Sequence, residues 1–302
     1  MMSRTADMWW LFTRQTVTIG KDQQILNAVK LMVRRGFRHI PVTDAEFRLV
    51  GIVSAQDVMN TIHSALSSSK SANAGTILLK ALSKPASQIM NKEAVAGEAS
   101  QTLADSITMM TDRSLSALPL IDKNRRVQGI VTLRDLVSLM AQGAGRLDLQ
   151  VQEVMTDKIH SLKTSDTILD AIAVMAAKKI RRVAITAHNG KSYAGIVTNK
   201  DVLRLLDSAY SYRVMRPEDA FKIKLSQVMD TGFGTINAEE DVRVAAWHMM
   251  TLGFGGLIVM KEGPVGIITE RDLIHRACKI KGSDFLKGAV RPSDDTSDKP
   301  SW

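Results

Sequence analysis

Four short stretches of this sequence place a glycine, a hydroxyl residue and an aspartate at one fixed spacing. They read GIVSAQD (51–57), GIVTLRD (129–135), GIVTNKD (195–201) and GIITERD (266–272). A hydroxyl residue three positions before an acid, ahead of an apolar run, is typical of a capping box at the start of a helix. One such stretch would be interpreted as a cap alone, whereas four of them favour an additional role.

The chemistry of these stretches suits a phosphorylated sugar. The acid is aspartate in every copy, although the capping box usually takes Glu or Gln, and a short carboxylate can accept two hydrogen bonds from a sugar diol. The start of a helix offers free N–H groups and a partial positive charge, which favour a phosphate near the hydroxyl. A cation separates hydroxyl and acid in three copies, as Arg134, Lys200 and Arg271, and Gln56 takes this place in the first copy.

Pairs of basic residues strengthen the preference for anions. RRGFRHIP contributes Arg38 and His39, and KKIRRVA contributes Arg181 and Arg182 at equivalent positions. An arginine at the mouth of a cleft favours two-pronged contact with a phosphate. The alternative interpretation is a pair of exposed basic corners without a ligand.

The net charge of +9 is unevenly distributed along the chain. Residues 11–84 carry ten Lys and Arg against four Asp and Glu, and residues 149–222 carry twelve against eight. This excess favours anionic partners, either phosphate groups or nucleic acid. The alternative is a basic surface that only keeps the protein soluble.

The four stretches belong to a longer internal repeat. Residues 11–42, 89–120, 154–185 and 228–259 align without a gap, with a methionine at the same place in each. Each window predicts a short entry strand, a helix and a second strand, and the glycine stretch then adds a third strand and a second helix. The predicted fold class is α/β (α+β), built from four β-α-β-β-α units. Because so small a sheet cannot bury both faces alone, the units must pair.

Together these features resemble the CBS domain family, as two tandem pairs called Bateman modules. The arrangement is similar to the regulatory γ subunit of AMP-activated protein kinase, so the resemblance implies a pseudo-symmetric disc around adenine nucleotides. The resemblance divides the chain into repeats 1 to 4 at residues 11–62, 85–141, 150–207 and 224–278. Residues 63–84 and 208–223 are expected to be linkers or extra helical pieces, and residues 283–302 a disordered tail.

The resemblance also implies roles for individual residues. The ribose-binding residues would be Asp57, Asp135, Asp201 and Asp272. The phosphate-binding residues would be Ser54, Thr132, Thr198, Thr269, Arg38, His39, Arg181, Arg182, Arg134, Lys200 and Arg271. The backbone around Ile40, Leu118, Val183 and Leu257 would edge the adenine.

Some copies depart from the family pattern. Repeats 3 and 4 have Ala184 and Ile258 in place of a proline, and repeat 4 has Gly255–Gly256 where a basic pair is expected. Repeat 4 is therefore the first candidate for a poor or empty site. Repeat 1, with Ser54 and Gln56, is the second.

Other functional classes find little support in the sequence. A single cysteine excludes an internal disulfide and fits a cytoplasmic protein, no apolar run is long enough to span a membrane, and no metal-binding or catalytic motif occurs. Cys278, Trp247 and the methionines are interpreted as core residues, and MWWLF (8–12) as the entry segment of repeat 1.

The predicted function is that of a non-catalytic regulatory protein. It would bind AMP, ADP or ATP between paired repeats and signal the energy state to a protein partner, without a catalytic cofactor or metal. S-adenosylmethionine or a cyclic dinucleotide is a less favoured ligand. The alternative is an RNA- or ribosome-binding factor that uses the basic disc, gated by nucleotide. The sequence does not decide whether the protein forms a homodimer, which partner it has or how many sites are occupied.

Overall fold

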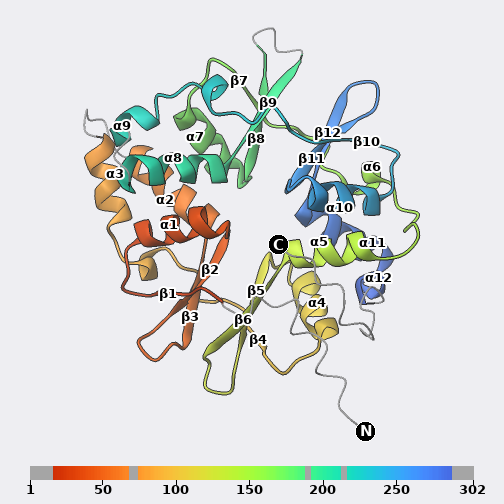
Figure 1. Ribbon diagram of the computed structural model, residues 1–302, viewed down its shortest axis with the longest axis horizontal. Helices are drawn as coiled ribbons and strands as arrows, with labels where there is room; N and C mark the ends of the chain where they lie inside the picture. Colours follow the sequence, from red (N-terminus) through yellow and green to blue (C-terminus); the bar gives the residue numbers. More distant parts are fainter. Residues whose placement is uncertain (1–15, 68–73, 188–191, 212–215, 288–302) are drawn as a thin grey trace.

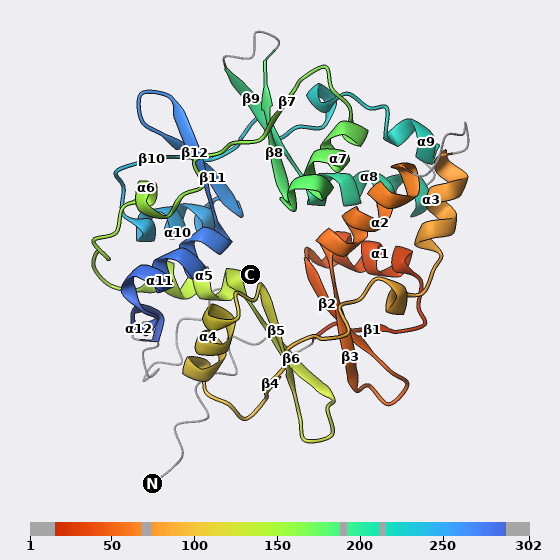
Figure 2. The same cartoon turned by 180° about the vertical axis from the view of Figure 1, so that it is seen from behind.

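The computed structural model describes residues 16–67, 74–187, 192–211 and 216–287. Within these ranges each repeat has the predicted β-α-β-β-α order, and the four units lie around a common centre (Figures 1 and 2). The α/β fold class is thereby confirmed. The segment MWWLF lies outside the described residues.

The first two repeats have these elements. Repeat 1 consists of β1 (Ile19–Gly20), α1 (Ile25–Arg35), β2 (His39–Thr43), β3 (Leu49–Ser54) and α2 (Ala55–Ser67). Repeat 2 consists of β4 (Gly97–Glu98), α4 (Leu103–Asp112), β5 (Ala117–Ile121), β6 (Val127–Thr132) and α5 (Leu133–Gln142). Between them lie α3 (Ala74–Leu82) and the 3-10 turn η1 (Ala86–Gln88).

The last two repeats follow the same order. Repeat 3 consists of α6 (Val151–Val154), β7 (Ser161–Lys163), α7 (Ile168–Lys178), β8 (Arg182–Thr186), β9 (Tyr193–Thr198) and α8 (Asn199–Ser211). Repeat 4 consists of η2 (Leu225–Gln227), β10 (Thr235–Asn237), α10 (Val242–Thr251), β11 (Gly256–Met260), β12 (Pro264–Thr269), the π-helical turn η3 (Asp272–Arg276) and α11 (Ala277–Lys281). The short helices α9 (Pro217–Ala220) and α12 (Asp284–Lys287) complete the described chain.

Every repeat contains the same three-stranded sheet. The entry strand runs parallel to the middle strand, and the third strand runs antiparallel to it. The register shifts near the end of the middle strand at equivalent places, after Val42, Leu120, Ile185 and Val259. The gapless alignment of the four windows therefore corresponds to one repeated backbone geometry.

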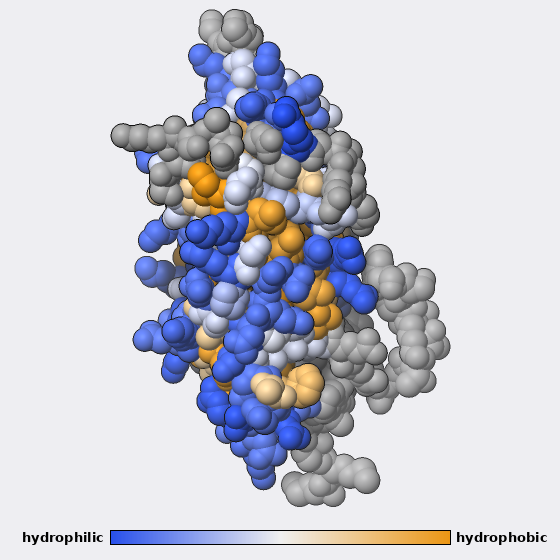
Figure 3. All heavy atoms as spheres, turned by 90° about the vertical axis from the view of Figure 1, so that its left-hand side faces the viewer, coloured by the Kyte–Doolittle hydropathy of each residue, from blue (hydrophilic) through white to orange (hydrophobic). Residues whose placement is uncertain are grey.

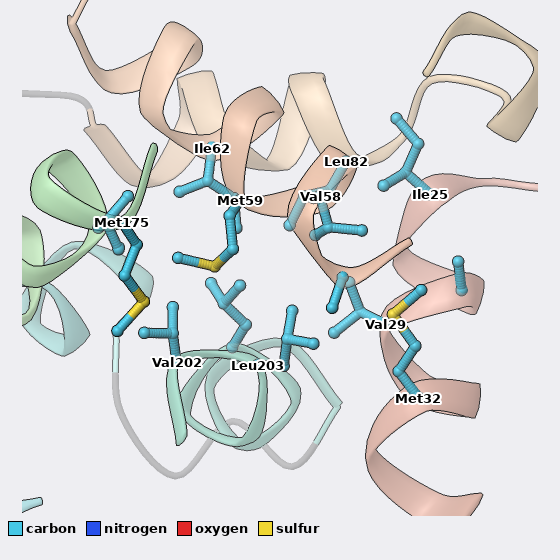
Figure 4. Close-up of a cluster of buried hydrophobic side chains, with 14 of the residues drawn as sticks. Ile25, Val29, Met32, Val58, Met59, Ile62, Leu82, Met175, Val202 and Leu203 are labelled. Atoms are coloured by element: carbon cyan, nitrogen blue, oxygen red, sulfur yellow. The ribbon is translucent and has the colours of Figure 1, made fainter. Parts of the chain in front are cut away.

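Helices join repeats 1 and 3, and likewise repeats 2 and 4, through two apolar cores. The first core combines buried side chains of repeats 1 and 3, and α1 and α2 pack against α8 and α7. Figure 4 shows Met59 of α2 and Met175 of α7 pointing toward one another, beside Val202 of α8. The second core combines repeats 2 and 4, where α5 packs against α10.

Sheet edges join repeats 1 and 2, and likewise repeats 3 and 4. Ile52 pairs with Asn91, Ile196 pairs with Asp230, and Thr156 pairs with Ile267. These contacts explain the glycine of the repeated stretch. A Cβ on Gly195 would lie 2.8 Å from the carbonyl oxygen of Asp230.

The same close approach recurs at Gly51 and Gly266. A Cβ on Gly51 would lie 2.8 Å from the carbonyl oxygen of Asn91, and one on Gly266 would lie 2.8 Å from that of Thr156. Real Cβ atoms do not approach backbone so closely, so only glycine fits between neighbouring repeats.

Two expectations from the sequence need correction. Trp247 lies on α10 and is 54% exposed, so it does not belong to the core. The stretches expected to be linkers or extra helical pieces contain the helices α3 and α9. The predicted disordered tail is helical at its beginning, because α12 forms there and buries Leu286.

The outer surface is mixed in character. Figure 3 shows the edge formed around α2, α3 and α8, where apolar side chains lie among larger hydrophilic areas. Within the described ranges, no helix combines the length and apolarity that crossing a bilayer requires.

Replacing Met175 with alanine tests the core shared by repeats 1 and 3. The side chain is fully buried, so we expect the free energy of unfolding to fall by about 2–5 kcal/mol. Urea unfolding followed by circular dichroism measures this loss. Leu169→Ala on the same helix, where the side chain is 42% exposed, is the control and should cost far less. Equal losses in both variants would contradict a core that joins the two repeats.

Candidate ligand-binding clefts around an arginine cluster

The four repeated helix starts share one hydrogen-bond pattern. In each, the backbone N–H and the hydroxyl of the Ser or Thr donate to the same carboxylate oxygen, Oδ2, of the aspartate. The N···O and O···O distances run from 2.6 to 3.0 Å in the pairs Ser54–Asp57, Thr132–Asp135, Thr198–Asp201 and Thr269–Asp272. The cap therefore occupies Oδ2 of each aspartate, and the other oxygen, Oδ1, takes no part in the cap.

Aspartate at this position is not by itself a sign of a ligand. Thr102 with Asp105 at α4, and Thr167 with Asp170 at α7, form the same capping box on exposed helix starts. The preference for Asp over Glu consequently says less than the sequence suggested. What distinguishes the repeated stretches is where their second carboxylate oxygen lies.

That second oxygen, Oδ1, has different surroundings in the different repeats. In repeat 4 it accepts from Thr156 Oγ1 at 3.4 Å and pairs with Arg276 Nε at 3.3 Å. Arg276 stands at the end of the π-helical turn η3 and also donates to the carbonyls of Val154 and Met155. The carboxylate of Asp272 is thus engaged on both sides by protein groups.

The carboxylate of repeat 2, Asp135, has fewer partners than that of Asp272 among the described residues. Among the described residues, no hydrogen bond or ion pair engages Asp135 Oδ1. Burial raises the pKa of the Asp135 carboxyl, although the hydrogen bonds from Thr132 oppose this shift. In repeat 3, Arg204 lies 3.6 Å from Asp201 Oδ1, an ion pair longer than a hydrogen bond.

Three of the aspartates line cavities near the centre of the molecule, and we name each cleft after its aspartate. The Asp135 cleft has about 210 Å³, the Asp201 cleft about 540 Å³ and the Asp272 cleft about 340 Å³. Asp57 instead lines an open groove of about 500 Å³ beside α2 and α3. None of the other predicted site residues lines this groove, and Ser54 lines none of the four cavities.

The predicted phosphate-binding residues gather at the three clefts. The Asp135 cleft is lined by Arg38, His39, Thr132, Arg134 and Arg181. The Asp201 cleft is lined by Arg38, Arg134, Arg182, Thr198 and Lys200. The Asp272 cleft is lined by Arg38, Arg181, Arg182, Thr269 and Arg271. Arg38 therefore borders all three.

The predicted adenine-edge residues point elsewhere. The side chains of Ile40, Leu118, Val183 and Leu257 are at most 1% exposed and belong to the two cores. Because side chains alternate along a strand, the residue after each one lies on the opposite side of the sheet. Pro41, Ala184 and Ile258 accordingly line the Asp135, Asp272 and Asp201 clefts. An adenine contact with the backbone beside them stays a prediction.

Arginines from different repeats converge at the centre. Arg181 of repeat 3 donates to Ser116 Oγ at 3.1 Å, and Arg271 of repeat 4 donates to the same oxygen at 2.6 Å. Burial, followed by the charges of Arg38, Arg271 and Arg182, lowers the pKa of Arg181 to about 10. Burial and the charge of Arg38 also lower the pKa of Arg182 to about 10, against the attraction of Glu270 and Asp272.

Glu270 lies among these cations. It accepts hydrogen bonds from Arg38 at 2.5 Å and from Arg134 at 3.2 Å, and its side chain is 4% exposed. The neighbouring His39 stays neutral, since burial and then Arg181, Arg38 and Arg271 lower its pKa well below the ordinary value.

The glycines of repeat 4 make room for this cluster. A Cβ on Gly256 would lie 2.6 Å from Arg182 Nη1 and 2.9 Å from the carbonyl oxygen of Ile268. A Cβ on Gly255 would lie 2.7 Å from Arg182 Nη2. The missing side chains, interpreted from the sequence as a weak grip on a ligand, therefore accommodate an arginine of repeat 3.

Sequence reasoning missed two residues of the cluster. Glu270 stands between the hydroxyl and the cation of its stretch, where the other copies have Ala55, Leu133 and Asn199. An acid at this one place was a visible signal. Ser116 belongs to no motif, and its role as a shared acceptor depends on two arginines that lie far away in sequence. In the described part of the chain, no group of His, Cys, Asp and Glu has the arrangement of a metal site.

Comparison with protein families agrees with this geometry. The CBS domain model matches residues 10–64, 86–142, 151–208 and 225–278. This chain belongs to the CBS domain family. The CBS repeats found in this way differ by at most two residues at each end from the predicted ones, and the sheet contacts group them as two Bateman modules, repeats 1–2 and 3–4.

Individual relatives cover nearly the whole chain. An uncharacterized 33.4 kDa protein in a ribosomal RNA operon of Thermofilum pendens is 30% identical over 287 residues, which are 90% of this chain and 92% of the relative. The crystal structure of protein MJ1225 from Methanocaldococcus jannaschii matches with a TM-score of 0.76 at 19% identity, covering 90% of this chain and 99% of that one. A conserved protein from Pyrococcus horikoshii matches with a TM-score of 0.57 at 15% identity, covering 88% and 97%. At these identities the two structures show the shared fold.

His275 in η3 gives the protein a specific sensitivity to acid. Burial and the charge of Arg271 lower its pKa to about 4, whereas an unfolded histidine has a pKa of about 6.5. Between these values the unfolded state binds more protons, so stability falls as the pH drops from about 6.5 to 4. Between pH 7 and pH 5, we expect the free energy of unfolding of His275→Gln to fall by about 1 kcal/mol less than that of the native protein, after allowance for solvent screening. Thermal unfolding at both pH values measures this, and parallel losses in the two proteins would contradict it.

Proposed function

We propose that this CBS protein is a non-catalytic cytoplasmic regulator that binds adenine nucleotides in its central clefts and reports the energy state to a protein partner. The Asp135 cleft carries the proposal, because it combines a carboxylate oxygen without a protein partner in the described structure with several guanidinium groups. The carboxylate suits a ribose diol, and the guanidiniums suit phosphates. MJ1225, which has the same fold, has been proposed as an archaeal homologue of g-AMPK.

The walls of this cleft suit each part of a nucleotide. Val17, Pro41 and Ile130 offer apolar surface for a base, and Thr132 and Asp135 stand at the start of α5 for the sugar. Arg38, Arg134 and Arg181 stand on the side toward the centre, near the Glu270 carboxylate. A ligand here touches both CBS repeats of one module, and it therefore favours one arrangement of the modules over others.

The environments of the four aspartates favour unequal sites. Asp135 keeps an oxygen for a ligand, Asp201 shares its oxygen with Arg204, and Asp272 has both oxygens engaged. Asp57 borders a groove that is lined by Lys84 and by none of the arginines of the central cluster. We expect the Asp135 cleft to bind nucleotide most tightly, and the Asp272 cleft to bind it only if Arg276 turns away.

Replacing Asp135 with asparagine tests this function. The amide has a single oxygen, which cannot accept from both the Thr132 cap donors and a ribose diol, so we expect the affinity for AMP or ATP to fall by about tenfold to a hundredfold. Isothermal titration calorimetry measures it. Asp170→Asn is a matched control, because it removes the same kind of helix cap at an exposed site away from the clefts. Unchanged affinity in Asp135→Asn, or an equal fall in both variants, would overturn the proposal.

A second candidate function is binding to ribosomal RNA. It is favoured by the net charge of +9 and by the relative from Thermofilum pendens, which is described as a protein in a ribosomal RNA operon. If it is correct, the protein will co-sediment with ribosomal subunits at low salt and dissociate as salt rises, and saturating AMP or ATP will change the bound fraction. Absence from the ribosomal fractions at low salt, with and without nucleotide, would exclude this function.

A further inference from the structure

Glu270 occupies the place where a ligand anion would meet the central arginines. It is the first residue after Thr269, and its side chain is almost completely buried. Its two hydrogen-bond donors, Arg38 and Arg134, belong to the opposite Bateman module. One carboxylate of repeat 4 thus holds an arginine from each repeat of the other module.

The charge at the centre is far from balanced. Arg181 and Arg182 stand near the same carboxylate, and burial together with neighbouring positive charge lowers the pKa of each to about 10. Both remain cationic at neutral pH. Several guanidiniums therefore share one glutamate, and further negative charge entering the clefts is attracted to them.

The partners of Glu270 are also the residues that a ligand would use. Arg38 borders the Asp135, Asp201 and Asp272 clefts, and Arg134 borders the first two. Carboxylate and phosphate oxygens bind a guanidinium in the same two-pronged way. A phosphate that reaches Arg38 or Arg134 must therefore displace Glu270 or remain close to its charge.

We propose that Glu270 is a built-in counter-anion that determines specificity by competing with ligand phosphates for Arg38 and Arg134. The buried carboxylate repels each added phosphate and thereby weakens the binding of nucleotides of higher charge more than that of nucleotides of lower charge. Because Arg38 is common to three clefts, this selection acts on all of them. The inference deepens the proposed nucleotide-binding function and rests on it for the identity of the ligand.

Glu270→Gln tests the competition, because the amide keeps the shape of the side chain and removes its charge. Calorimetric titrations with adenosine, AMP, ADP and ATP give the ratio of native to variant dissociation constants. We expect a ratio near one for adenosine, about tenfold for AMP and a larger ratio for ADP and ATP. Glu239→Gln is the control, since that exposed glutamate pairs with Lys261 and its loss changes the net charge equally.

Inorganic pyrophosphate gives a second readout that needs no adenine. We expect it to raise the thermal unfolding midpoint more for Glu270→Gln than for the native protein, because it replaces the missing counter-charge. If the variant folds only with pyrophosphate present, the same conclusion holds. If it does not fold at all, Glu270→Asp, whose shorter side chain reaches both arginines less well, is expected to shift the ratios in the same direction by a smaller factor.

The outcomes separate this inference from the proposed function. Equal ratios for adenosine, AMP and ATP, with equal stabilisation by pyrophosphate, would overturn the role of Glu270 while nucleotide binding stands. Failure of every adenine compound to bind, with a stronger pyrophosphate effect in the variant, would overturn the adenine ligand and support the role of Glu270.

Discussion

The backbone of one repeat passes so close to the third strand of the next that only glycine fits between them. At Gly51, Gly195 and Gly266, a Cβ would meet a neighbouring carbonyl oxygen at 2.8 Å. This approach lets the entry segment of one repeat pair with the sheet edge of the other. Since the hydroxyl and the aspartate follow the glycine by three and six residues, the same contact fixes where the helix starts lie. The Asp201 and Asp272 clefts therefore depend on the close approach of backbone at Gly195 and Gly266.

The two kinds of contact between repeats have different consequences. Sheet edges join repeats within a module, and helices join repeats 1 with 3 and 2 with 4 through two separate apolar cores. Each core therefore contains one repeat from each module, so the modules cannot shift without disturbing both. The arginines at the centre come from all four repeats and feel any such shift. An anion bound there is well placed to bias the arrangement of the whole disc.

Much of the fold could be predicted from the sequence, because local patterns and a repeat determine it. The gapless windows and the glycine stretches predicted the three strands and two helices of each repeat, and the apolar residues Ile25, Ala28, Val29 and Met32 of α1 lie at helical spacing and are buried. Trp247 was misinterpreted because the elements that pack against a helix decide which of its faces is buried, and the sequence of the helix alone does not show this. The first turn of the tail was misjudged because the apolar contact of Leu286 lies against distant helices.

The clefts were less predictable, for a physical reason. The motif fixes one oxygen of each aspartate through the cap, but the surroundings of the other oxygen come from residues outside the motif, such as Arg276 and Arg204. Similarly, the partners of Glu270 lie 232 and 136 residues away. How closely one repeat matches the motif therefore says little about how well a cleft formed by two repeats can bind a ligand.

Gly255 and Gly256 illustrate how the copies have specialised. Repeat 4 has no side chain at the two places where repeat 3 carries Arg181 and Arg182, and the guanidinium of Arg182 fills the space left free. A side chain at 256 would meet both the Arg182 guanidinium and the carbonyl oxygen of Ile268, so a smaller residue at 182 would relieve only one of the two contacts.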